Sequence, residues 1–219
     1  MKTVFGVVGA AMALSGSAFA FVPWVNTNGT AAFFDWTGGG SDTGLFGSPV
    51  LVGGDTFVFF PSGFRAESSN GVAGAAYDRL EVQVDAHAGF SFSDIRITEY
   101  GDYGVIGTGQ VAASGTLFVT DLATFNVYTD NLLTNPASPI TSGIGNWSGT
   151  AGVNVSAAHA TSLRIVLNNN LFAVTDGTSV AWIEKKVFGQ AVGIQIIPTP
   201  GSALIAGFGV LAMARRRRN

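Results

Sequence analysis

The chain has 219 residues, of which 47% are hydrophobic and only 11% are charged, and it contains 30 Gly and no Cys. This much apolar material excludes a disordered chain, and the absence of Cys excludes disulfide scaffolds, zinc ribbons and thiol catalysis. The formal net charge of −3 provides no basic surface for phosphate groups, so we expect no nucleic-acid partner.

Residues 1–20 have the three-part pattern of a secretory signal peptide. Lys2 supplies the positive charge, an apolar stretch follows over residues 4–14, and Ala18 and Ala20 form a small-residue cleavage site. A buried N-terminal helix or strand is the alternative, but the three-part pattern favours the signal peptide. We therefore expect the Sec translocon and signal peptidase as partners, and an exported mature protein that begins at Phe21.

Residues 21–197 predict an all-β domain, an antiparallel β-sandwich of jelly-roll-like form. Short apolar or alternating runs are separated by Gly, Asn, Asp, Ser and Pro at a spacing of about 8–15 residues, and no segment has a helical period. The clearest strand covers 77–86, where Leu80, Val82 and Val84 alternate with charged and polar residues. Further strands are expected at 31–36, 55–60, 90–100, 109–113, 115–120, 124–129, 152–156, 163–168, 171–174, 179–187 and 191–197.

Bend and turn signals divide these strands. In 90–100 the apolar residues change parity after Phe92, which predicts a β-bulge or a bend at Ser93-Asp94. Glycine-containing segments at 38–40, 53–54, 70–71, 101–102 and 176–177 predict tight turns. Residues 130–147 contain two Pro with several Asn and Ser, and predict a long exposed loop. Seventeen Phe against four Tyr and four Trp predict a core filled by aromatic rings.

The body ends at a short motif made of Pro198, Thr199, Pro200 and Gly201, because two prolines at this spacing interrupt any preceding strand or helix. An apolar run over 202–214 follows, and it leads into the basic cluster of Arg215, Arg216, Arg217 and Arg218. As a helix the run spans about 20 Å, which is less than a hydrocarbon core of ~30 Å. We expect a short transmembrane helix whose arginines hold the C-terminus on the cytoplasmic side.

Together, the signal peptide, the Pro-x-Pro-Gly motif, the short apolar segment and the Arg cluster resemble the PEP-CTERM sorting signal that exosortases recognise. The resemblance covers residues 197–219, and Thr199 stands where the family usually has Glu. A sortase signal is the main rival, but the order Leu-Pro-x-Thr-Gly is absent. The resemblance implies export by a Gram-negative type bacterium, transient anchoring in the membrane, and removal of the tail by an exosortase-type membrane processing enzyme. It also implies association with extracellular polysaccharide or biofilm.

The sequence offers little catalytic chemistry, and we expect no enzymatic activity. No Gly-x-Ser-x-Gly elbow is present, and the only two histidines are best explained as solvated turn residues. Glycoside hydrolysis needs two carboxylates about 5–10 Å apart. Pairs can be drawn at Glu81 with Asp85 and at Glu99 with Asp102, but exposed strand carboxylates explain both pairs better.

Two kinds of ligand site remain as candidates. Calcium prefers oxygen ligands, so Asp35, Asp42 and Asp55 are candidate calcium ligands, although turn-forming roles explain them better and we expect no other cofactor. Among the aromatic residues, Trp147 is the candidate platform for stacking on sugar rings, because its surrounding segment is polar throughout.

Without the terminal segments, residues 21–200 keep six basic residues against all fourteen acidic ones, so the body has a formal charge of −8. The leading hypothesis is an exported, non-enzymatic β-sandwich that is sorted to the cell surface or matrix and has a structural or adhesive role in exopolysaccharide. A carbohydrate-binding module is the alternative, and an extracellular enzyme that acts on polysaccharide is the third hypothesis.

Overall fold

The computed structural model of the protein describes residues 21–187 and 192–200. They form two antiparallel β-sheets and one 3₁₀ turn at Ser156–Ala158, which confirms the predicted all-β fold. The predictions made for Ala18, Ala20, Gly201, residues 202–214 and the cluster from Arg215 to Arg218 lie outside the described residues. Within the described ranges, no helix combines the length and the apolar character that crossing a membrane requires.

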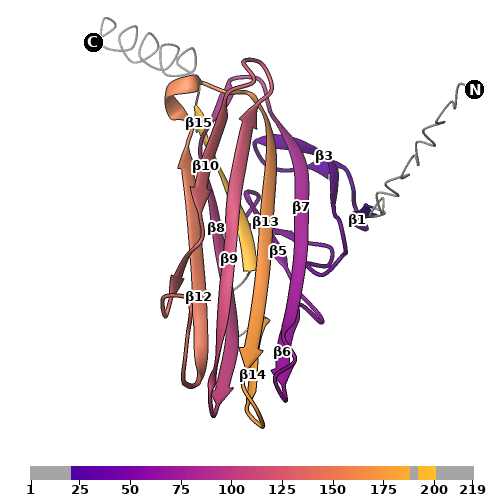
Figure 1. The fold of residues 1–219 in the computed structure, drawn as a ribbon. Coiled ribbons are helices and arrows are strands. Elements are labelled where there is room, and N and C mark those ends of the chain that lie inside the picture. Colours follow the sequence, from indigo (N-terminus) through magenta and orange to yellow (C-terminus); the bar gives the residue numbers. More distant parts are fainter. Residues whose placement is uncertain (1–20, 188–191, 201–219) are drawn as a thin grey trace, which may run out of the picture.

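The first sheet has the strand order β1-β3-β7-β13-β9-β10, with the short β2 paired to β3. Its strands are β1 (Val22–Pro23), β2 (Gly29–Thr30), β3 (Phe34–Ser41), β7 (Gly74–Ala86), β9 (Gly109–Asp121), β10 (Val127–Asn131) and β13 (Ser162–Thr175). The central β13 pairs along almost its whole length with both β7 and β9. These long strands run side by side along the molecule (Figure 1).

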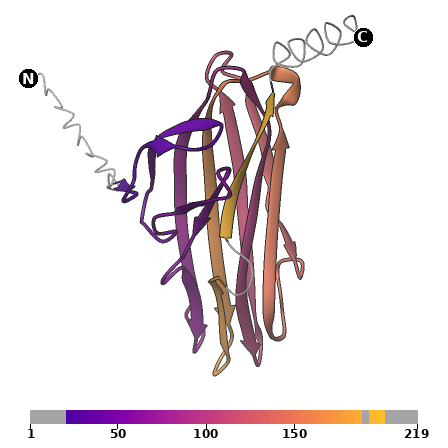
Figure 2. The same ribbon diagram turned by 180° about the vertical axis from the view of Figure 1, so that it is seen from behind.

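The second sheet has the strand order β11-β12-β8-β15-β5-β4. Its strands are β4 (Val50–Val52), β5 (Thr56–Phe59), β8 (Phe90–Ile106), β11 (Leu133–Asn135), β12 (Gly143–Asn154) and β15 (Val192–Pro200), together with β6 (Arg65–Ser69) and β14 (Val180–Lys185). One half of β8 pairs with β15 and the other half with β14, which in turn pairs with β6. In Figure 2 the N-terminal segment (indigo) and β15 (yellow) both lie at the front of the molecule.

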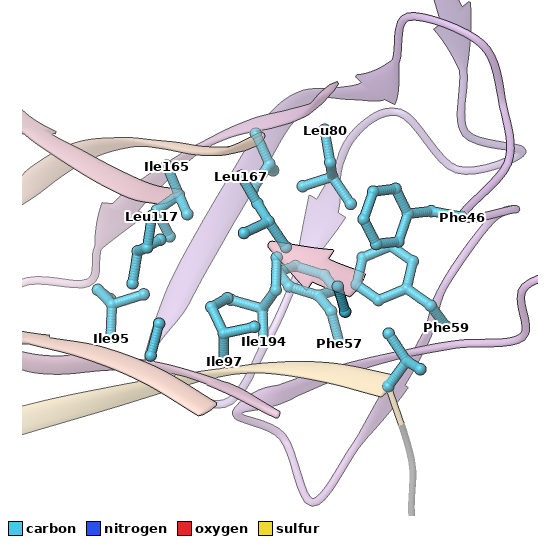
Figure 3. Close-up of a cluster of buried hydrophobic side chains, with 14 of the residues drawn as sticks. Phe46, Phe57, Phe59, Leu80, Ile95, Ile97, Leu117, Ile165, Leu167 and Ile194 are labelled. Carbon is cyan, nitrogen blue, oxygen red and sulfur yellow. The ribbon is translucent and has the colours of Figure 1, made fainter. Parts of the chain in front are cut away.

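The core lies between the two sheets and is built from the inward face of each strand. Leu117 on β9 lies opposite Ile95 on β8, and Leu167 on β13 lies opposite Ile97, as the stick view in Figure 3 shows. At one end the cluster continues into phenylalanines, among them Phe46 and Phe59, whose ring centroids lie 5.7 Å apart. The predicted aromatic core is therefore confirmed for this part of the sandwich.

Two local predictions are confirmed. Leu80, Val82 and Val84 are fully buried on β7, as the alternation predicted. The bulge in β8 is also present, because its pairing with β15 shifts register and leaves Ser93 as the extra residue. An extra residue reverses the parity of the inward side chains, which is the change that the sequence showed after Phe92.

Several predicted breaks are wrong. Residues 38–40 lie inside β3, the strands expected at 109–113 and 115–120 are the single strand β9, and those expected at 163–168 and 171–174 are the single strand β13. Gly101 lies inside the continuous strand β8, where a Cβ would stand 1.8 Å from the carbonyl oxygen of Glu184, so it allows close packing and makes no turn. The predicted loop at 130–147 contains β11 and the beginning of β12. The strand end expected before Pro198 is also wrong, since β15 pairs with β8 as far as Pro200. Beyond Gln195 the strand no longer pairs with β5, and an edge position tolerates proline, which has no N–H to donate.

Candidate functional site

Trp147, the expected sugar platform, is only 1% exposed, so that prediction is wrong. The indole points inward from β12 and its Nε1 donates a hydrogen bond of 3.0 Å to the carbonyl oxygen of Glu184. Its direct partner on β8 is Gly101, whose missing side chain leaves the space that the ring needs. The polar residues around Trp147 in the sequence are the outward-facing half of a strand, which explains why the segment resembled a loop.

The structure does not bring the three calcium candidates together. Asp35 lies 3.1 Å from Nε2 of His87, Asp42 lies 3.6 Å from Arg79, and Asp55 accepts a hydrogen bond from Thr56. Hydrogen bonding to His87 lowers the pKa of Asp35. Among the residues that the structure describes, no three acidic or histidine side chains are grouped as metal ligands would be.

The carboxylate pairs drawn from the sequence do not converge either. Glu99 is buried inside the sandwich, whereas Asp102 is bound by Lys186 at the surface. Glu81 is held by Arg79, and Asp85 accepts hydrogen bonds from neighbouring side chains. Within each pair the two carboxylates are held by different partners, which is not the arrangement that glycoside hydrolysis requires.

A different site lies at the open edge of the sandwich, where β10 ends the first sheet and β11 ends the second. Leu132, between these strands, packs against the core, and its backbone N–H donates to the carbonyl of Gly115 at 2.9 Å. This anchored crossing places Asn131 in the lining of two separate surface hollows. We call the surface around them the Asn131 edge, and its polar side chains are Tyr77, Arg96, Thr98, Ser114, Thr116, Asp130, Asn131, Thr150, Asn168 and Asn170.

The larger hollow has a volume of about 540 Å³ and lies against β8 and β12. Its polar lining comes from Arg96 and Thr98 on β8, Thr150 on β12 and the end of β10. Asp130 accepts a hydrogen bond of 2.9 Å from the backbone N–H of Gly152, which ties β10 to the second sheet. Both sheets therefore contribute to the lining of the hollow, and the hydrogen bond from Gly152 to Asp130 holds the end of β10 against β12.

The smaller hollow has a volume of about 360 Å³ and lies over β7, β9 and β13 of the first sheet. Thr116 donates a hydrogen bond of 2.9 Å to Oδ1 of Asn131, and Oδ1 of Asn168 has no hydrogen-bond partner among the described residues. Tyr77 stands at this hollow with 42% of its surface exposed. Partial burial, assisted by the charge of Asp42, raises the pKa of Tyr77, so its hydroxyl stays a neutral donor.

These hollows combine hydrogen-bonding groups with one exposed aromatic ring. Their volumes fall within the range of about 300–1,000 Å³ that is typical of small-molecule sites. The recess beside Trp24 and Trp36, at about 170 Å³, is below that range. Asn168 and Asn170 share one parity in β13 and so face the same side of the sheet, a signal that the sequence contained but that became visible only with the strand boundaries known.

Comparisons with known proteins identify no family: no protein-family model and no curated protein matches the sequence. Among solved structures, the chain is similar to TmCBM61, a carbohydrate-binding module in complex with β-1,4-galactotriose, at 8% identity and a TM-score of 0.23. That match covers 80% of this chain and 96% of the other. A second match, to infectious bursal disease virus Gx strain, has 9% identity and a TM-score of 0.24, and covers 73% and 49%. Neither TM-score is high enough to support an inference about function.

Proposed function

We propose that the protein is an exported, non-enzymatic β-sandwich that binds a neutral extracellular polysaccharide at the Asn131 edge and thereby has an adhesive or structural role in the matrix. The observation that supports this function is the meeting of two polar hollows at Asn131, with the exposed ring of Tyr77 beside one of them. Sugars are bound by this combination, because their hydroxyl groups need hydrogen-bond partners and their ring faces pack on aromatic side chains.

The charges of the site favour a neutral ligand. The lining contains one cation, Arg96, and one anion, Asp130, among ten polar side chains. Residues 21–200 carry a formal charge of −8, which repels an anionic polysaccharide. Asp130 is the only carboxylate in the two linings, and glycoside hydrolysis requires two, which supports binding without cleavage.

Binding is tested by retention of the purified protein on insoluble polysaccharides, with neutral glucans and galactans compared with an anionic one. The Tyr77→Ala variant should lose about tenfold in affinity, since one aromatic contact and one hydrogen bond are worth about 1–2 kcal/mol. Phe172→Ala is the matched control, because Phe172 is 39% exposed on the same sheet but lines neither hollow. Equal retention of Tyr77→Ala and wild type, or no retention on any neutral polysaccharide, would exclude this site.

The route to the matrix is a separate part of the proposal. The signal peptide and the PEP-CTERM-like tail support export followed by sorting through an exosortase-type enzyme. Deletion of Arg215 to Arg218 should change tail processing and increase release from the cell, because the positive charges hold the C-terminus on the cytoplasmic side. Unchanged processing and cell association in the deletion strain would contradict sorting without affecting the binding proposal.

A further inference from the structure

Three buried polar side chains from three different strands meet inside the sandwich. Lys185 comes from β14, Glu99 from β8 and Asn169 from β13, and their exposed fractions are 2%, 2% and 0%. Lys and Glu are almost never fully buried unless they are paired. The cluster is therefore costly to bury, and the proposed binding function makes no use of it.

The geometry places an amine beside a carboxamide. Nζ of Lys185 and Nδ2 of Asn169 each lie 2.5 Å from the same oxygen, Oε1 of Glu99. The two nitrogens are therefore no further apart than the sum of these distances, and Cγ of Asn169 is bonded directly to Nδ2. Nζ forms an ion pair with Glu99, but the geometry of this contact is not that of a hydrogen bond. Two further buried atoms, Oε2 of Glu99 and Oδ1 of Asn169, have no hydrogen-bond partner among the described residues.

Burial shifts Lys185 toward the neutral amine. Nζ lies 4.9 Å from the ring centroid of Phe46 and 4.7 Å from that of Phe64, and these ring faces oppose the shift because they attract the charged form. Burial lowers the pKa of Lys185 to about 8, although the carboxylates of Glu99 and Asp78 act in the opposite direction. A lysine amine becomes a nucleophile when desolvation favours its uncharged form.

We propose that Lys185 and Asn169 join spontaneously through a side-chain amide bond, with Glu99 carrying the proton between them. Proton transfer from Nζ to Glu99 produces the free amine, whose lone pair attacks Cγ of Asn169 and forms the C–N bond. Glu99 passes this proton to Nδ2, the Cγ–Nδ2 bond breaks and ammonia leaves, and Nζ gives its surplus proton back to Glu99 to become the amide N–H. The atoms balance without an oxidant or a co-reactant: one amine and one primary amide become one secondary amide and ammonia.

The bond would tie the two sheets together through the core. β13 belongs to the first sheet and β14 to the second, and the link closes a ring that includes the turn at Asp176 and Ser179. This chain has no cysteine, so an amide of this kind is the cross-link that its own side chains can supply. The cross-link is independent of the Asn131 edge, so its failure would leave the binding proposal intact.

Peptide mass spectrometry of the purified full-chain protein tests the proposal directly. Trypsin should fail to cleave after Lys185, and the peptide from Ile165 to Lys186 should be lighter than its sequence by one ammonia, about 17 Da. A glutamate-specific protease separates Asn169 from Lys185 by cutting after Glu184, but the two pieces should remain joined. This joining distinguishes the cross-link from cyclisation of Asn169 on its own backbone.

Matched variants assign the roles. Glu99→Gln should lose the cross-link because it cannot carry the proton, whereas Lys186→Arg should retain it, since Lys186 is paired at the surface with Asp102. Each variant is first shown to be folded by a cooperative thermal transition. Recovery of an unlinked wild-type peptide that ends at Lys185 would overturn the proposal, and a cross-link in folded Glu99→Gln would overturn the role of Glu99.

Discussion

The indole of Trp147 donates its hydrogen bond to the backbone of Glu184, 3.0 Å away, across the glycine at position 101. This contact connects β12 to β14 over the intervening strand β8. The contact therefore links the two strands that flank β8 in the second sheet. It also explains why a tryptophan from a polar segment is part of the core.

Trp147→Phe should destabilise the fold without affecting polysaccharide binding. The substitution keeps a ring in the core but removes the donor to Glu184, and a buried group left without its partner costs about 1–3 kcal/mol. Denaturant unfolding measures the loss, and retention on polysaccharide should match the wild type. Loss of retention with unchanged stability would instead indicate a ligand platform.

Gly101→Ala should be destabilising by about 1–3 kcal/mol or more, because the added Cβ would lie 1.8 Å from the carbonyl oxygen of Glu184 and 2.6 Å from Nε1 of Trp147. Gly152→Ala on β12 is the matched control. Its Cβ would meet the carbonyl oxygen of Ile95 at 3.6 Å, an ordinary contact. Thermal unfolding of both variants compares them, and equal melting temperatures would disprove the packing role of Gly101.

The fold class followed from the sequence because alternation is a local property. Leu80, Val82 and Val84 show their common face without any knowledge of the partner strands. Strand lengths did not follow, because Gly115 interrupts the pattern of β9 although the strand is continuous. The reason is tertiary: a Cβ at Gly115 would lie 2.8 Å from the carbonyl oxygen of Asn168.

The candidate site was not predictable from the sequence. The ten polar side chains of the Asn131 edge come from six strands, and the hollows exist because β10 and β11 diverge into different sheets. Trp147 was selected because its sequence neighbours are polar, but neighbours in a strand alternate between two faces.

Lys185 shares its parity with the buried Ile183, and this alternation alone places the lysine on the inward face of β14.

Asp78 holds in place the loop that connects β3 in the first sheet to β4 in the second. Its buried carboxylate accepts backbone N–H groups of Thr43, Leu45 and Phe46 at 2.9, 2.8 and 3.3 Å. Asp78→Ala should lower the free energy of unfolding by about 3 kcal/mol or more, since hydrogen bonds to a charged group are worth about 1.5–3 kcal/mol each.

Hydrogen exchange checks this prediction locally, because these three amides should lose protection in Asp78→Ala. Asp94→Ala is the control, as the carboxylate of Asp94 accepts from the exposed side chain of Asn154 and its loss should change stability by less than about 0.5 kcal/mol. Retained protection of Phe46 in Asp78→Ala would show that the loop is held by other contacts.

The pH dependence of stability should expose the buried lysine when the cross-link is blocked. In Asn169→Ala, Lys185 keeps its amine, and burial lowers its folded pKa from 10.5 to about 8. Between these pH values the unfolded chain binds more protons than the folded chain, so stability rises with pH by up to about 1.4 kcal/mol per unit. Below pH 8 both states are protonated and the burial penalty is present in full.

Urea unfolding of Asn169→Ala from pH 8 to 10 measures this rise. The double variant Asn169→Ala/Lys185→Met is the reference, because it keeps Glu99 and Asp78, the carboxyl groups that act on Nζ, but has no amine. The wild type should also lack the rise, since its Nζ is an amide after cross-linking. The same slope in all three proteins would mean that Lys185 does not titrate inside the sandwich.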